Sequence, residues 1–299
     1  MKKLVFAVCT LLFLGFSVFA QAVYETGEAN DRVRLGVMQG PTAFSAVMID
    51  PSVAELSVFP SPADALARIT KGELDMAVLP ANAALSLYNR GAGIKALAIV
   101  GEGMLSLVGT SVHGDTVSVP GAGGTPDHMA RLLFPEYTPD YSVTAPAQLA
   151  QLLIAGKCTL ALLPQPFVTM VLSANQNVES LADVGARWKA LTGLDRYPMS
   201  ILVVSAEYAG KNPVAVMRLC NAYKLSVKKV NGDPVAAGER INALLGMDAK
   251  VAAKAVPQCA LVYIDGEQAK SEAAAYFDVL MNLDSGAIGG KTVSDGFWY

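Results

Sequence analysis

Charged and catalytic side chains are scarce in this 299-residue sequence. Charged residues make up 16% of it, and only two residues are histidines, whereas 53% are hydrophobic. The lysines and arginines are scattered without a basic run, and the formal net charge is −3. We therefore expect no nucleic-acid-binding surface. The length and the hydrophobic content allow two domains of ordinary size, each with its own core.

Motifs for metal binding and for covalent catalysis are also missing. The cysteines form neither a CxxC pair nor a cluster with histidine, so we expect no metal site and no cofactor. One disulfide among Cys158, Cys220 and Cys259 is left open as an alternative to three free thiols. No GxSxG motif is present, and no glycine loop is followed by the lysine of a nucleotide-binding loop.

Residues 1–22 have the pattern of a secretory signal peptide. Two lysines precede an apolar run over residues 4–19, and the small residues Ala20 and Ala22 follow it. The apolar run is shorter than the ~20 residues of a spanning helix, which argues against a membrane anchor. We therefore expect a soluble, extracytoplasmic protein, either periplasmic or otherwise exported.

A segment of the sequence recurs at a constant spacing. Residues 61–89 and 145–176 share glycines, prolines and apolar residues, and each match lies 84 positions further along the chain. Glycine and proline mark the joints of any βα unit, which is the alternative explanation. We interpret the match as two lobes built on one α/β plan. The matched pairs are Pro62 and Pro146, Ala63 and Ala147, Gly72 and Gly156, Ala77 and Ala161, Leu79 and Leu163, Pro80 and Pro164, and Gly40 and Gly124.

The apolar segments predict an α/β fold in two lobes. Runs such as residues 33–38 and 76–79 are apolar on both faces, which is typical of a parallel sheet covered on both sides. We expect a mostly parallel sheet flanked by helices in each lobe. Residues 31–107 and 206–299 would form the first lobe and residues 108–205 the second. Crossings near Leu107 and Val203 would form a hinge.

The carboxyl ends of the predicted strands supply the candidate site. In open α/β sheets, ligands bind beyond these ends, and two loops of each lobe would therefore face one cleft. Asn82 has a second interpretation, because it stands where a helix N-cap would be expected. The predicted ligand-binding residues are Gln39, Gly40, Pro41 and Thr42 on the first loop, Ala81 and Asn82 on the second, Gly123, Gly124, Thr125 and Pro126 on the third, and Gln165 on the fourth.

The predicted cleft offers neutral hydrogen-bonding groups and helix N-termini. Such groups favour a small neutral or anionic ligand, since a cation would need an acid or an aromatic face. Asp127 is expected to interact with a helix dipole, His113 to lie in a loop, and His128 to be a capping or exposed residue. Without a nucleophile and base, the cleft favours reversible binding, and we expect a protein that is not an enzyme.

Several segments together resemble the extracytoplasmic substrate-binding proteins of ABC importers. The resemblance is to the branch of nitrate, sulfonate, taurine and thiamine-precursor binders, and it covers nearly all of the chain after residue 22. It implies a two-lobed, type II periplasmic-binding-protein fold, and delivery of solute to a permease and an ATPase by a monomer. The segments are QGPT, GELDMAVLPANAALSLYNRG, GAGGTPDHMARLL, LLPQPFVTMVL, VPQCALVYI and IGGKTVSDGFWY.

The resemblance leaves two other functions open, and this chain departs from the family pattern at one position. Many of these binders carry glutamate where this chain has Gln165, which removes a charge from the cleft. One alternative is an enzyme of the same fold that makes the thiamine pyrimidine, which would need a reactive histidine in the cleft. The other is an extracytoplasmic sensor domain.

The N-terminal pattern gives a first testable prediction. We expect the exported protein to be cleaved after Ala20 or Ala22, because the small residues there suit a signal peptidase. N-terminal sequencing of the protein from its host measures this directly. A cytoplasmic protein that still begins at Met1 would contradict export.

Overall fold

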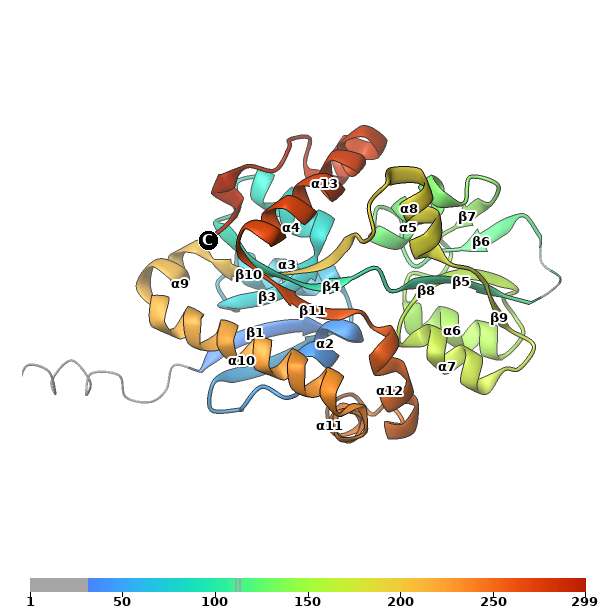
Figure 1. The fold of residues 1–299 in the computed structure, drawn as a ribbon, viewed down its shortest axis with the longest axis horizontal. Coiled ribbons are helices and arrows are strands. Elements are labelled where there is room, and N and C mark those ends of the chain that lie inside the picture. Colours follow the sequence, from blue (N-terminus) through green and yellow to red (C-terminus); the bar gives the residue numbers. More distant parts are fainter. Residues whose placement is uncertain (1–31, 111, 113) are drawn as a thin grey trace, which may run out of the picture. The chain divides into compact units, whose positions relative to one another are not determined.

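The computed structural model describes residues 32–110, 112 and 114–299. The predicted signal peptide and His113 lie outside the described residues. Within Val33–Tyr299, the strands form two sheets, one of six strands and one of five. Both sheets are flanked by helices (Figure 1), which confirms the predicted α/β class.

The six-stranded sheet has the order β11-β4-β10-β3-β1-β2. Strand β1 pairs in parallel with β2 and β3, whereas β10 is antiparallel to both β3 and β4, and β11 is antiparallel to β4. The sheet is therefore mixed rather than mostly parallel, because β10 enters it from the other sheet in the opposite direction. The strands are β1 (Val33–Met38), β2 (Ala54–Phe59), β3 (Met76–Pro80), β4 (Ile94–Glu102), β10 (Pro198–Ser205) and β11 (Leu261–Ile264).

The five-stranded sheet has the order β7-β6-β8-β5-β9 and is mixed for the same reason. Strand β6 is parallel to β7 and β8, and the arriving strand β5 is antiparallel to β8 and β9. Strand β7 is followed by a loop that leads into a helix. The strands are β5 (Leu105–Gly109), β6 (Thr116–Ser118), β7 (Thr138–Asp140), β8 (Leu160–Pro164) and β9 (Glu179–Ala182).

Helices cover both faces of the six-stranded sheet. Side chains alternate along its strands: Leu79 and Ile201 face the core under α3, α4 and α13, and Met76 and Leu202 face the core under α2, α10 and α11. These helices are α2 (Pro41–Ala46), α3 (Pro62–Thr70), α4 (Ala81–Asn89), α9 (Ala206–Lys211), α10 (Pro213–Gly232), α11 (Pro234–Leu245), α12 (Ala249–Ala255) and α13 (Gly266–Asp284), with short 3-10 turns at Val256–Gln258, Ser285–Ile288 and Asp295–Phe297.

The five-stranded sheet is also covered on both faces. Leu160 and Leu162 of β8 face the core with α5 and α8, and Ala161 and Leu163 face the core with α6 and α7. The helices are α5 (Thr125–Leu133), α6 (Pro146–Ile154), α7 (Phe167–Ala174) and α8 (Val184–Thr192).

The sequence repeat corresponds to repeated local structure. Helices α3 and α6 begin at the matched residues Pro62 and Pro146. Proline lacks a backbone N–H, but at the first position of a helix this removes no hydrogen bond within the helix. Gly72 and Gly156 follow them with φ of +72° and +68°, a backbone conformation that glycine adopts without a steric penalty. The matched strands β3 and β8 then end at Pro80 and Pro164.

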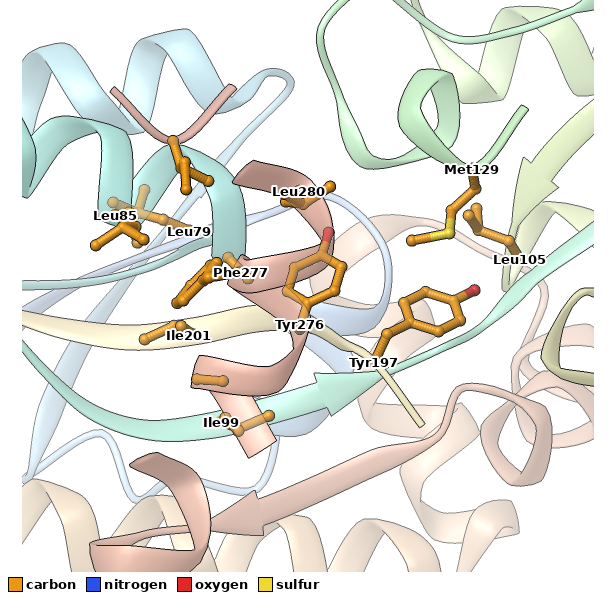
Figure 2. Close-up of a cluster of buried hydrophobic side chains, with 14 of the residues drawn as sticks. Leu79, Leu85, Ile99, Leu105, Met129, Tyr197, Ile201, Tyr276, Phe277 and Leu280 are labelled. Carbon is orange, nitrogen blue, oxygen red and sulfur yellow. The ribbon is translucent and has the colours of Figure 1, made fainter. Parts of the chain in front are cut away.

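One hydrophobic core continues from the first sheet to the second. It includes Leu79 and Ile201 near α13, and Leu105 and Met129 near α5 (Figure 2). Tyr276 of α13 links the two parts, because its ring centroid lies 6.0 Å from that of Trp188 and 6.3 Å from that of Tyr197. Trp188 and Tyr197 are themselves 5.2 Å apart. We refer to Trp188, Tyr197 and Tyr276 as the aromatic cluster.

The chain passes between the sheets beside a buried carboxyl group. Glu102, at the end of β4, is 2% exposed, and its Oε2 accepts a hydrogen bond of 2.7 Å from Arg196, which precedes the returning strand β10. Its Oε1 and the Oε2 of Glu272 have no hydrogen-bond partner, although Glu272 lies within reach of Glu102. Burial raises the pKa of Glu102, and the neighbouring Glu272 adds to this, while Arg196 opposes it.

We predict that Glu102 makes the stability of the fold depend on pH. The pKa of Glu102 is raised in the folded protein, so Glu102 contributes fully to stability at pH values below its pKa in the unfolded chain. This contribution to stability is lost as the pH rises through the pKa of Glu102 in the folded protein. Glu102→Gln should therefore flatten the fall in melting temperature above about pH 4.3. Thermal melts across this range measure the slope, with the exposed Glu239→Gln as the control. Equal slopes in the two variants would contradict the prediction.

Candidate functional site

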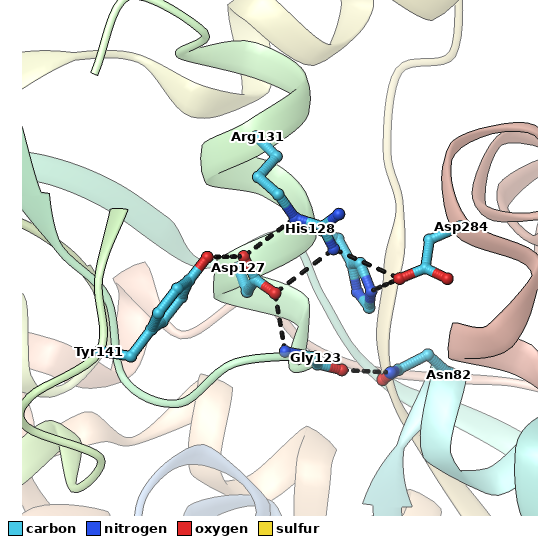
Figure 3. Close-up of polar contacts among 7 residues, drawn as sticks. All are labelled: Asn82, Gly123, Asp127, His128, Arg131, Tyr141 and Asp284. Atoms are coloured by element: carbon cyan, nitrogen blue, oxygen red, sulfur yellow. Dashed lines mark hydrogen bonds and ion pairs between the residues drawn. The ribbon is translucent and has the colours of Figure 1, made fainter. Parts of the chain in front are cut away.

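The loops predicted to face a cleft meet in two pairs, each with one loop from either sheet. The backbone of Gly40, after β1, lies against the loop after β8: a Cβ added to it would stand 3.6 Å from Pro166 and 3.8 Å from Phe167. Asn82, after β3, donates a hydrogen bond from Nδ2 to the carbonyl oxygen of Gly123, at 3.2 Å (Figure 3). The predicted loops therefore converge in two pairs and are in contact with each other.

Gly123 is held from both sides. Its N–H donates to Oδ2 of Asp127 at 2.7 Å, while its carbonyl accepts the bond from Asn82. Asp127 also accepts hydrogen bonds from the Tyr141 hydroxyl at 2.7 Å and from Arg131 at 3.1 Å. Asp127 is expected from the sequence to interact with the helix dipole, and it does lie in the first turn of α5. Its additional role is to fix the glycine-rich loop.

These contacts set the charge of Asp127 and Tyr141. Burial alone would raise the pKa of Asp127, but the hydrogen bonds from Tyr141, Gly123 and Arg131 hold it below the usual value. Burial and the bond to Asp127 raise the pKa of Tyr141 to about 12. Asp127 is therefore a carboxylate with its hydrogen-bonding capacity in use, and it is not a free acid facing the cleft.

Asn82 is not a helix N-cap. That position of α4 belongs to Pro80, and Asn82 lies inside the first turn with 4% of its surface exposed. The capping alternative was wrong because α4 begins immediately at the end of β3. Its Nδ2 bonds to Gly123, and its Oδ1 is buried without a partner.

Three further side chains around this contact have buried polar atoms without a hydrogen bond. Thr125 and His128 lie on α5, and Tyr276 lies on α13. His128 is 0% exposed, so the expectation of a capping or exposed histidine was wrong. Its Nε2 stands 3.7 Å from Asp284, which is beyond hydrogen-bond distance (Figure 3). Burial lowers the pKa of His128, with Arg131 adding to the effect, so the ring is neutral at pH 7.

Other predicted site residues have different surroundings. Gln165 is 6% exposed, and its Oε1 accepts hydrogen bonds from the N–H and the hydroxyl of Thr169 at 3.2 and 2.8 Å. The hydroxyl of Thr42 donates to the carbonyl of Met38 and accepts from its N–H, both at 2.8 Å, so it closes its own loop. The remaining predicted site residues differ in burial: Gln39 and Gly123 are exposed, Gly40 and Ala81 are buried, and Pro41, Gly124 and Pro126 are intermediate.

Tyr276 and Asp284 were not found from the sequence. Both lie on α13, about 150 residues after the glycine-rich loop, and the apolar surroundings of Tyr276 in the sequence indicate only a buried helix face. Cys158, Cys220 and Cys259 are free thiols. The described part of the chain contains no group of three or more potential metal ligands. Among the described residues, no helix combines the length and apolar character needed to cross a membrane.

The contacts of Asp127 give a stability prediction. Asp127→Asn keeps the shape but removes the charge that accepts from Arg131 and Tyr141, and hydrogen bonds to charged groups contribute about 1.5–3 kcal/mol. We expect a loss of that order in the free energy of unfolding, measured by urea denaturation. The exposed Asp278→Asn on α13 is the matched control. A loss no larger than in the control would show that Asp127 does not hold the loop.

A family model described as menaquinone biosynthesis matches residues 43–278. A search of curated proteins found no match.

Three solved structures show the same fold. An ABC transporter protein from Parabacteroides distasonis is 24% identical, with 90% of this chain and 99% of that chain covered and a TM-score of 0.77. The alkanesulfonate-binding protein SsuA from Xanthomonas axonopodis pv. citri is 13% identical, with 86% and 94% covered and a TM-score of 0.66. The periplasmic aliphatic sulphonate-binding protein SsuA from Escherichia coli is 14% identical, with 89% and 90% covered and a TM-score of 0.67. The fold is that of periplasmic binding proteins.

Proposed function

The chain belongs to the menaquinone-biosynthesis family, and from this premise we propose that it is the solute-binding component of an ABC importer. In this role it binds a small polar molecule reversibly between its two lobes and delivers the molecule to a permease and its ATPase. The structures of similar fold include an ABC transporter protein and two sulfonate-binding proteins, which supports the proposal. The predicted export signal supports an extracytoplasmic location, and we propose a monomer, as the resemblance implies.

The observation that favours binding is the set of neutral polar atoms between the lobes. Asn82 from one lobe and Thr125 from the other each bury an oxygen that has no hydrogen-bond partner. Buried polar atoms are normally paired, and a ligand between the lobes would pair them. Closure around such a ligand would be a hinge motion at the two crossings between the sheets.

Reversible binding also agrees with the ionisable groups at this place. Among the described residues of the four loops and the first turn of α5, Asp127 has its hydrogen bonds in use and His128 is neutral. None of these residues forms a hydrogen bond with His128, as a nucleophile activated by a base would. We therefore propose a protein that is not an enzyme. Its ligand would be similar in size to the ligands of the sulfonate, nitrate and thiamine-precursor binders.

An enzyme is the second candidate, and His128 is the observation that favours it. Its two ring nitrogens are buried without hydrogen bonds beside the site, and a neutral histidine can act as a general base. The description of the family as menaquinone biosynthesis also supports a biosynthetic step. In this case a bound substrate would leave as a different molecule. The extracytoplasmic sensor stays a third possibility, with the same binding site.

Ligand identification separates the two main candidates. Native mass spectrometry of the protein from its host should show one co-purified small molecule, which denaturation then releases for identification. An importer component returns this molecule unchanged after incubation with purified protein. Conversion that is lost in His128→Gln would instead identify an enzyme and contradict the importer proposal.

The same molecule allows a test of the site. Asn82→Ala should weaken binding by roughly 1–3 kcal/mol, because a buried ligand group would lose its partner. Gln165→Glu should also weaken the binding of an anionic ligand, because it places a carboxylate at the predicted site. Isothermal titration calorimetry measures both, with the exposed Asn221→Ala as the control. Affinity equal to the wild type in both variants would place the site elsewhere.

A further inference from the structure

Four buried side chains from three helices have polar atoms without partners at one place. They are Asn82 of α4, Thr125 and His128 of α5, and Tyr276 of α13, and each is 0–4% exposed. Asn82 contacts the loop that leads into Thr125, and Thr125 lies close enough to Tyr276 to act on its hydroxyl. Unpaired buried polar atoms are rare in folded proteins, so several around one place require a physical explanation.

Tyr276 cannot turn its hydroxyl to a different partner. Its ring is fixed in the aromatic cluster with Trp188 and Tyr197, and the side chain is fully buried. Burial raises the pKa of its hydroxyl, and the contact with Thr125 only partly opposes this, so the hydroxyl is un-ionised. The fixed ring therefore fixes the hydroxyl oxygen of Tyr276, and neither this oxygen nor Oγ1 of Thr125 completes a hydrogen bond.

We propose that Asn82, Thr125, His128 and Tyr276 form the deep end of the ligand site, and that the part of the ligand bound there is neutral and carries a hydrogen-bond donor. A hydroxyl or an amide N–H meets this description. The proposal rests on the proposed binding function and narrows its ligand class.

The donor follows from Asn82. Its Nδ2 already donates a hydrogen bond to Gly123, whereas its buried Oδ1 has no partner, and a ligand group that pairs with this oxygen must donate. A sulfonate or nitrate has no proton to donate to this oxygen. The hydroxyl groups of Thr125 and Tyr276 can both donate and accept, and they would pair with the remaining sites of a ligand hydroxyl.

Neutrality follows from the charged groups nearby. Arg131 is the cation on α5 near the site, and its guanidinium already bonds to Asp127 and lies 3.4 Å from Asp284. Burial keeps His128 neutral. An anion at the deep end would therefore lose its hydration without gaining a cation, which is strongly unfavourable.

The first test uses ligand-free protein and two substitutions that keep the shape of the side chain. Thr125→Val and Tyr276→Phe remove oxygens that have no partner until a ligand binds. We expect melting temperatures equal to or above that of the wild type, because apolar groups of the same shape fit a buried site without unpaired atoms. Tyr223→Phe is the control, since the buried hydroxyl of Tyr223 bonds to Ser45 and its loss should lower the melting temperature.

The second test measures binding in the same variants. Each should bind the co-purified molecule at least tenfold more weakly than the wild type, whereas Tyr223→Phe should bind it normally. Taurine and nitrate at millimolar concentration should not raise the melting temperature of the wild type. Stabilisation by either anion that Tyr276→Phe removes would overturn the neutral ligand class.

The outcomes separate this proposal from the importer function. If both variants melt below the wild type by as much as Tyr223→Phe, the oxygens are paired inside the protein, and the deep site is overturned while the importer function stands. If the variants are stable and lose binding but the molecule is converted, the deep site stands and the importer function fails.

Discussion

Packing of α13 between the two sheets is the constraint on which the site depends. Through Phe277 and Leu280 the helix belongs to the core over the six-stranded sheet, and through Tyr276 it packs against Trp188 of the other lobe. The same helix ends at Asp284, beside His128 and Arg131. A helix shared in this way sets the distance between α4 and α5, and hence the position of Asn82 relative to Gly123 and Thr125.

The structures of similar fold include binders of sulfonates, yet the fold does not determine the charge of the ligand. Here the carboxylate of Asp127 occupies the donors that could otherwise bind an anion: the N–H of Gly123 and the guanidinium of Arg131. The polar groups without partners at this contact, on Asn82, Thr125, His128 and Tyr276, are uncharged. The local hydrogen bonds of one acidic residue therefore decide the chemistry of the cleft more strongly than the fold does.

The sequence predicted the features that depend on neighbouring residues. The turns at Gly72 and Gly156, the starts of α3 and α6 and the strands around Leu79 and Leu163 follow from glycine and proline at the joints and from continuous apolar runs. The loops that meet at the cleft followed from this plan, because strand ends locate binding loops.

Features that depend on distant contacts could not be predicted in the same way. His128 is polar and lies in the first turn of a helix, so only its contact with α13 explains its burial. Tyr276 belongs to an apolar helix face, and nothing in its own segment indicates a partner in the other lobe. The antiparallel pairing of β10 likewise follows from the path of the chain between sheets, not from its apolar composition.

The contacts between the two lobes differ in strength. Each ring of the aromatic cluster buries about 150–250 Å², so separating a ring from its neighbours would cost about 4–6 kcal/mol at ~25 cal/mol/Å². The hydrogen bond from Asn82 to Gly123 contributes about 0.5–1.5 kcal/mol, and Gly123 is exposed to water that can replace it. If the two lobes move apart, we therefore expect the contact at Asn82 to break first, while Tyr276 stays packed on Trp188 and Tyr197. A ligand bound as proposed above would then reach the Tyr276 hydroxyl last.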